Sequence, residues 1–116
     1  MRRIEAAGWT LEVPETHLER TRGLLGRTEL DTSHVLVLAR CSSVHTIGMR
    51  FPIDVIAFDA GWTLIDIRTM LPGRVSWPRR RVRNVVETAA GRGMAFSASL
   101  DGRTIRGALG TGHHRT

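Results

Sequence analysis

Apolar residues recur along the chain in short segments with the period of β-strands. Residues 9–13 (Trp-Thr-Leu-Glu-Val) alternate apolar and polar, which predicts a strand with one buried face. Residues 35–39 (Val-Leu-Val-Leu-Ala) are continuously apolar, which predicts a strand buried on both faces. Residues 53–58 and 62–69 are also β-rich. A short connection that carries glycine, Asp59-Ala60-Gly61, joins them, so we expect a hairpin.

The C-terminal third has weaker signals. Residues 81–88 predict a further strand, and residues 94–100 alternate weakly between apolar and polar positions. Asp101-Gly102 is typical of a tight turn, after which residues 104–106 are expected to close a short hairpin. From residue 107 onward no period is visible.

One helix is predicted near the N-terminus. Thr16 and Glu19 have the spacing of a capping box, in which the hydroxyl accepts from the Glu19 amide and the carboxylate reaches back. Leu18 and Leu25 would share a face of this helix, and Gly26 is a natural terminator.

Many short strands, one capped helix and no alternation of strands with helices predict an α+β fold that is mainly β. We expect a single compact domain over residues 1–108, with a barrel-like or strongly bent antiparallel or mixed sheet and one N-terminal helix. Residues 109–116 are expected to form a flexible C-terminal tail.

Composition narrows the class of protein. The length of 116 residues fits one domain, and 41% apolar with 24% charged residues is ordinary for a globular chain. The lone Cys41 excludes an internal disulfide and a zinc site built on two cysteine pairs. No segment approaches the ~20 apolar residues of a membrane span, and the N-terminus does not have the pattern of a signal peptide. We therefore expect a cytoplasmic protein that does not bind membranes.

The formal net charge of +6 comes entirely from arginine, because the chain has no lysine. A compositional bias of the genome accounts for the missing lysine but not for the excess of positive charge. Arginine binds phosphates and carboxylates through two parallel hydrogen bonds, so the charge directs attention to anionic partners.

Three segments resemble one known family. Residues 44–59 (Val-His-Thr-Ile-Gly-Met-Arg-Phe-Pro-Ile-Asp-Val-Ile-Ala-Phe-Asp) resemble the central signature of the domain of unknown function 192 family. Residues 19–27 are similar to its Arg-Gly-Leu segment, and Val85-Val86-Glu87 followed by Ala90-Gly91 is similar to a third element. The resemblance implies a compact β-rich domain with a helix near its start. It implies no agreed activity and supplies no catalytic residue.

The best candidate site is the segment 41–54, where polar and titratable residues gather between two apolar strands. Binding residues often occupy loops that a rigid scaffold holds. His45 exchanges protons near neutral pH, Arg50 could hold a carboxylate or phosphate, and Asp54 could orient either side chain. The segment also contains Cys41, Ser42, Ser43, Thr46 and Met49.

If the three family segments converge in space, Arg22 and Glu87 become neighbours of this segment. The predicted ligand-binding set is then Arg22, His45, Thr46, Met49, Arg50, Asp54 and Glu87. The structural alternative is that Asp54 binds loop amides, and that His45 and Thr46 satisfy buried backbone groups.

The leading hypothesis is a noncatalytic binding or accessory domain that recognises an anionic small molecule or an acidic peptide through the 41–54 loop. A second hypothesis is an enzyme of unknown class that uses His45 and Asp54 for acid–base chemistry. Cys41 and His45 are four residues apart, but that spacing in a loop does not establish a nucleophile and its base. The five histidines show no paired ligand spacing, so we expect neither a metal site nor a cofactor.

A third hypothesis is association with nucleic acid through Arg79, Arg81 and Arg83. With Arg74 nearby they could follow a phosphate backbone, while Trp77 stacks on a base. The structural alternative is a solvated edge strand, on which charge prevents unwanted pairing. The chain carries no Gly-rich phosphate loop and no recognised nucleic-acid module, which favours the structural alternative.

Overall fold

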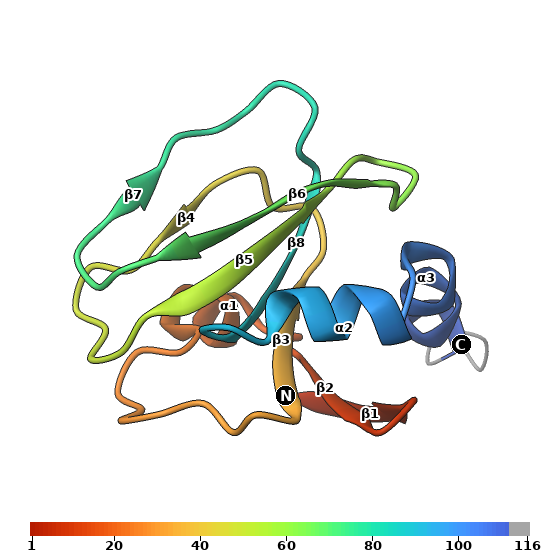
Figure 1. Ribbon diagram of the computed structural model, residues 1–116, viewed down its shortest axis with the longest axis horizontal. Helices are drawn as coiled ribbons and strands as arrows, with labels where there is room; N and C mark the ends of the chain where they lie inside the picture. The colour runs from red at the N-terminus through yellow and green to blue at the C-terminus, as the bar shows by residue number, and fades with distance from the viewer. Residues whose placement is uncertain (112–116) are drawn as a thin grey trace.

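The computed structural model describes residues 1–111 and contains one six-stranded mixed sheet (Figure 1). The strand order is β1-β2-β3-β8-β5-β6; β2 and β3 pair in parallel, and the other neighbours in this order pair antiparallel. The bounds are β1 Arg2–Ala6, β2 Trp9–Val13, β3 His34–Leu38, β5 Ile53–Phe58, β6 Leu64–Met70 and β8 Asn84–Ala89. Two further strands, β4 Val44–His45 and β7 Val75–Ser76, form a separate antiparallel pair.

Both faces of the sheet are covered, which explains the continuous apolar sequence of β3. On one side, here called the helical face, the helices α2 (Gly93–Ser99) and α3 (Gly102–Thr111) contribute to the core. On the other side, here called the loop face, residues 24–30 and the β4–β7 pair cover the sheet. Side chains of the helical-face core include Trp9, Val35, Val37, Ile56, Phe58, Phe96, Leu100 and Ile105. Those of the loop-face core include Leu24, Leu30, Leu36, Leu38, Val44, Val55, Met70 and Val85.

The predicted mainly β fold with a mixed sheet is confirmed, whereas a closed barrel is wrong. The edge strands β1 and β6 each pair with a single neighbour, so the sheet stays open. Residues 1–111 contain three helices rather than the one expected. Because α2 and α3 cover one face, the sheet buries its apolar side chains without closing on itself.

The N-terminal helix α1 (His17–Arg22) begins as predicted. Thr16 accepts a hydrogen bond from the Glu19 amide at 3.0 Å, and the Glu19 carboxylate accepts from the Thr16 amide at 3.2 Å. The helix ends earlier than the predicted Gly26, because Gly23 takes a positive φ of 51° that stops the helical repeat.

The weak alternation over residues 94–100 does not mark a strand, because residues 93–99 form α2, and the hairpin expected at 104–106 is wrong, because these residues lie in α3. Phe96 packs on Trp9 of β2 in an edge-to-face contact, with ring centroids 5.1 Å apart, and Ile105 is fully buried. Helix α3 continues to Thr111, past residue 109, where the tail was expected to begin. The expected tail residues 112–116, with His113 and His114, lie outside the described residues.

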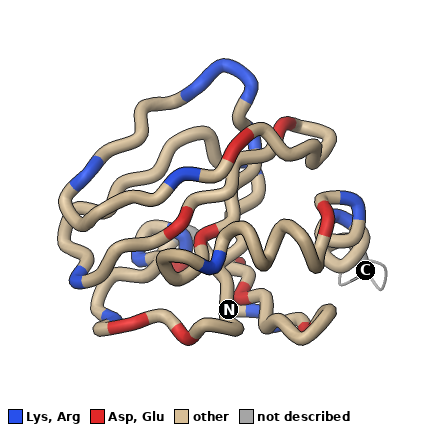
Figure 2. Tube along the Cα trace, viewed as in Figure 1, with Lys and Arg blue, Asp and Glu red and all other residues tan. Residues whose placement is uncertain are grey.

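The strand predicted over residues 81–88 begins later, at Asn84. Residues 80–81 form a turn, so the arginine-rich segment is an exposed loop between β7 and β8, seen as the blue apex in Figure 2. Within residues 1–111, no helix is long and apolar enough to cross a membrane.

Candidate ligand-binding site

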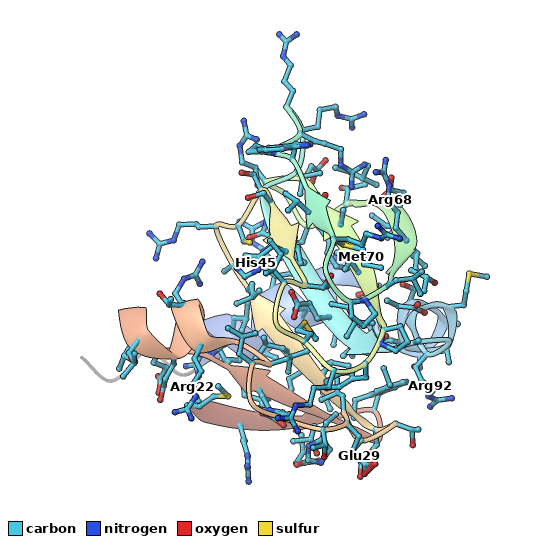
Figure 3. All side chains as sticks on the ribbon, turned by 90° about the vertical axis from the view of Figure 1, so that its left-hand side faces the viewer. Arg22, Glu29, His45, Arg68, Met70 and Arg92 are labelled. Carbon is cyan, nitrogen blue, oxygen red and sulfur yellow. The ribbon has the colours of Figure 1, made fainter. Side chains whose placement is uncertain are left out.

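A cavity of about 290 Å³ opens on the loop face between α1, β3, β8 and the segment 41–49. We call it the α1 cavity. Its apolar wall consists of leucines from β3 and from the turn that follows α1. Its polar residues come from α1, from the segment 41–45 and from β8. It is lined by residues 20–25, Leu36, Leu38, Cys41, Ser43, Val44, His45, Met49 and Glu87. In Figure 3, His45 lies above Arg22 on the same side of the molecule, with Arg68 on the opposite side of the view.

Glu87 is the buried carboxyl of this cavity. It lies on β8, the central strand between β3 and β5, where Leu36 and Val55 are its register partners. The residue is only 6% exposed, and no hydrogen bond or ion pair reaches its carboxyl from the residues that the structure describes. Burial raises the pKa of Glu87 to about 7, because the charged form loses its hydration. The carboxyl can therefore donate or accept a proton near neutral pH.

Two arginines and a histidine line the more exposed side of the cavity. Arg20 is half-buried, and its Nη2 donates to the Arg40 carbonyl at a distance of 3.4 Å. Arg22 and His45 are exposed. A ligand entering the cavity would meet guanidinium and imidazole groups before it reached Glu87.

Cys41 lines the same cavity as a thiol rather than a thiolate. Its Sγ donates to the Ser43 carbonyl at 3.1 Å. Burial raises the pKa of this thiol, and the nearby Glu87 carboxylate acts in the same direction. No hydrogen bond joins Cys41 to His45 within residues 1–111, so the geometry does not support a nucleophile and its base.

An ion-pair network on the loop face secures the segment that forms one wall of the cavity. Glu12 of β2 is buried, and Arg27 donates to its two carboxylate oxygens at 2.7 and 3.4 Å. His34 Nδ1 lies 2.9 Å from the same carboxylate. Burial opposes the charged form, yet the hydrogen bonds from Arg27 and His34 hold the pKa of Glu12 below its usual value. This network was not predicted from the sequence.

Four of the seven predicted ligand-binding residues meet in the α1 cavity, namely Arg22, His45, Met49 and Glu87. Arg50 is exposed and is not among the side chains that line it. Thr46 is fully buried and serves the backbone: its hydroxyl donates to the Leu71 carbonyl at 2.6 Å and accepts from the Arg74 amide at 2.9 Å. These bonds to backbone groups are what the structural alternative describes for Thr46.

Asp54 lies on the helical face, away from the cavity. Its carboxylate accepts from Thr69 Oγ1 at 2.7 Å and from the amides of Gly91 and Gly93 at 3.0 and 2.9 Å. These bonds hold the turn that leads into α2. The sheet separates Asp54 from His45, so the hypothesis of a His45–Asp54 acid–base pair is wrong in its geometry.

Replacing Asp54 by alanine is expected to destabilise the fold by about 3 kcal/mol, because the buried Gly93 amide and the partly buried Gly91 amide and Thr69 hydroxyl lose their acceptor. Urea denaturation followed by circular dichroism measures this loss. Asp101→Ala is a useful comparison, because that exposed carboxylate also accepts from backbone at the start of a helix. Equal losses for the two variants would contradict the buried role of Asp54.

The arginine-rich loop does not present one basic strand face. Arg79 donates to both oxygens of Asp66 at 2.7 and 3.0 Å, and this ion pair is half-buried. Arg83 turns back onto its own loop, where it donates to the carbonyls of Arg80 and Val82. Arg81 is exposed in the turn. The predicted pairing of Arg81 with Arg83 on a strand is therefore wrong.

The described part of the chain brings no three His, Cys, Asp or Glu side chains together in a way that could hold a metal ion. The α1 cavity itself presents arginine, histidine, thiol and carboxyl groups over an apolar wall.

Comparison with known families agrees with the sequence motifs. The sequence model of the domain of unknown function 192 family, described as "Uncharacterized ACR", matches residues 2–102, and the chain belongs to this family. No curated protein matches the chain significantly.

Two solved structures share the fold. One is of a "putative transcription regulator" from Sinorhizobium meliloti 1021, with 20% identity, a TM-score of 0.64, and coverage of 81% of this chain and 78% of that one. The other is a protein of unknown function from Novosphingobium aromaticivorans DSM 12444, with 19% identity, a TM-score of 0.62, and coverage of 82% and 75%. At these identities the likeness concerns the fold alone.

Proposed function

We propose that this chain is a noncatalytic binding domain that holds a small anionic molecule with an apolar body in the α1 cavity. The observation that carries the proposal is Glu87, a buried carboxyl without a partner among the described residues, beside a cavity. An acidic group in the centre of a sheet costs stability once it ionises. Such a group in a concave site is typical of binding and reaction centres.

The arrangement of charge defines the ligand class. Arg20 and Arg22 at the opening suit an anionic group, since guanidinium binds carboxylate and phosphate through charge-assisted hydrogen bonds. Leu24, Leu36 and Leu38 suit an apolar body. Glu87 suits a hydrogen-bonding group at the inner end of the ligand.

The volume favours a small molecule over an acidic peptide. A space of about 290 Å³ lies at the lower end of the roughly 300–1,000 Å³ of ligand pockets. An acidic peptide would reach the arginines at the opening without placing any group beside Glu87.

Noncatalytic binding is favoured over an enzyme for two reasons. His45 and Asp54, the proposed acid–base pair, lie on opposite faces of the sheet. The raised pKa of the Cys41 thiol leaves it protonated at neutral pH, and therefore a poor nucleophile.

Hexanoate, a carboxylate with an apolar body, probes the arginines and the apolar wall of this site. In a titration of the ¹⁵N-labelled chain followed by amide chemical shifts, hexanoate should shift residues 20–25 and 41–49. The double variant Arg20→Gln/Arg22→Gln should weaken its binding by about tenfold, because two charge-assisted contacts are lost.

The control Arg50→Gln removes one arginine charge from an exposed residue that does not line the cavity, and it should bind hexanoate like the unmodified chain. Shifts confined to other surfaces would contradict the proposal. So would an Arg50→Gln variant that loses as much affinity as the double variant. If an acidic peptide, and not hexanoate, shifts these amides, the site binds peptides instead.

A further inference from the structure

A second surface, separate from the α1 cavity, concentrates the positive charge of the chain. Residues 65–83 contain six of the seventeen arginines and one of the eleven acidic residues. Their formal net charge of +5 nearly equals the +6 of the whole chain. The remaining residues together are close to neutral. The positive electrostatic potential of the molecule is therefore concentrated around residues 65–83.

The surface is a groove rather than a uniform basic patch. A hollow of about 510 Å³ runs over β6 and β7. Arginine side chains line it together with apolar ones and one aromatic ring. We call it the tryptophan groove; it is lined by Arg68, Thr69, Met70, Leu71, Arg74, Val75, Ser76, Trp77 and Arg79. The turn with Arg80 and Arg81 lies next along the chain (Figure 2).

Trp77 is exposed in a way that folding does not explain. It is 76% exposed, whereas Trp9 and Trp62 are 5% and 8% exposed in the core. Leu71 and Val75, which line the same groove, are also exposed. An indole ring held in water between arginines is a stacking surface for a flat partner.

The arginines of the groove are oriented in advance. Asp66 accepts from both Nη atoms of Arg79 and from Nε of Arg68 at 3.2 Å, so one carboxylate fixes two guanidinium groups. Two cations around one anion leave a net positive charge. The terminal nitrogens of Arg68 are not used in these contacts and can donate to a phosphate.

From these observations we infer that the tryptophan groove binds single-stranded nucleic acid, with a base stacked on Trp77 and phosphates on Arg68, Arg74, Arg80 and Arg81. Base stacking on an aromatic ring combined with a basic track is the general mode of single-strand binding without sequence preference. A duplex hides its base faces, so Trp77 would have no role in binding one. An acidic peptide would satisfy the arginines but offers no planar group for the indole.

The fluorescence of Trp77 supplies the test. Because the other two tryptophans are buried, quenching by an unlabelled single-stranded oligouridylate reports on Trp77. We expect quenching at low salt, with an affinity that falls steeply as salt rises. Trp77→Ala should weaken binding by about tenfold, measured by fluorescence anisotropy of a labelled oligouridylate. Its thermal melting should be unchanged, since the side chain is exposed.

The charge of the loop has a matched control. Arg80→Ala/Arg81→Ala and Arg103→Ala/Arg106→Ala each remove two exposed arginines, the latter pair from α3. Only Arg80→Ala/Arg81→Ala should weaken binding of the oligouridylate strongly. Equal losses in the two variants, no binding at low salt, or tighter binding of a duplex would overturn the inference. Trp77-dependent binding of polyglutamate at equal affinity would assign the groove to acidic peptides instead.

Discussion

Replacing Glu87 by glutamine should stabilise the protein by about 3 kcal/mol above neutral pH and should change little in mild acid. The buried carboxyl keeps its proton up to about pH 7 in the folded chain but loses it near 4.5 in the unfolded chain. Between these values the folded state holds the extra proton. Stability therefore falls as pH rises through this window and levels off above it. Because glutamine cannot ionise, the Glu87→Gln variant does not lose this stability as the pH rises.

Urea denaturation at a series of pH values measures this effect. The difference between the Glu87→Gln variant and the unmodified chain should grow from about pH 4.5 to about pH 7 and then remain constant. Glu29→Gln removes the same charge from an exposed loop residue, and its pH curve should run parallel to that of the unmodified chain. A constant difference for Glu87→Gln at every pH would mean that the carboxyl is not buried.

Replacing Gly102 by alanine should destabilise the protein by about 3 kcal/mol or more. A Cβ at this position would lie 1.7 Å from the carbonyl oxygen of Trp62 and 2.8 Å from its carbonyl carbon. Both are backbone atoms, so relief requires α3 to move away from Trp62. That movement would withdraw Ile105 from the helical-face core. Thermal melting followed by circular dichroism measures the loss.

Gly107 provides the control in the same helix. A Cβ there meets nothing within 4 Å, and alanine favours helix by about 1 kcal/mol over glycine, so Gly107→Ala should raise the melting temperature. If Gly102→Ala has the same melting temperature as the unmodified chain, α3 does not pack closely on Trp62.

The strands were predictable because their signals are local. The continuous apolar residues of β3, the β-rich residues of β5 and the capping box before α1 are consistent with the observed elements. Helices α2 and α3 were missed because small residues dilute their pattern. The signal that remained was the spacing of four between Phe96 and Leu100, and between Ile105 and Leu109, which marks one face of a helix.

The site was predictable only in part, because both faces of the sheet are buried. In a half-buried strand, period two assigns each side chain to the core or to solvent. In β5 every residue is buried, so the sequence cannot tell that Asp54 faces α2 rather than the α1 cavity. Glu87 could be predicted as a site residue, because it is a single carboxylate that follows two valines in a predicted strand and belongs to a family segment.

The Glu12 network was hidden for a related reason. Alternation over residues 9–13 predicts that Glu12 faces solvent, but the segment after α1 folds over that face and brings Arg27 to the carboxylate. The contact between Glu12 and Arg27 depends on the path of the chain between them. Period and composition do not specify that path.

The ionisation of the Glu87 side chain tests the account most directly. A pH titration of its carboxyl ¹³C resonance, assigned by its loss in Glu87→Gln, should give a midpoint near pH 7. A midpoint near the ordinary value of 4.5 would place the carboxyl in water or beside a cation, and the α1 cavity would lose the group on which its proposed function rests.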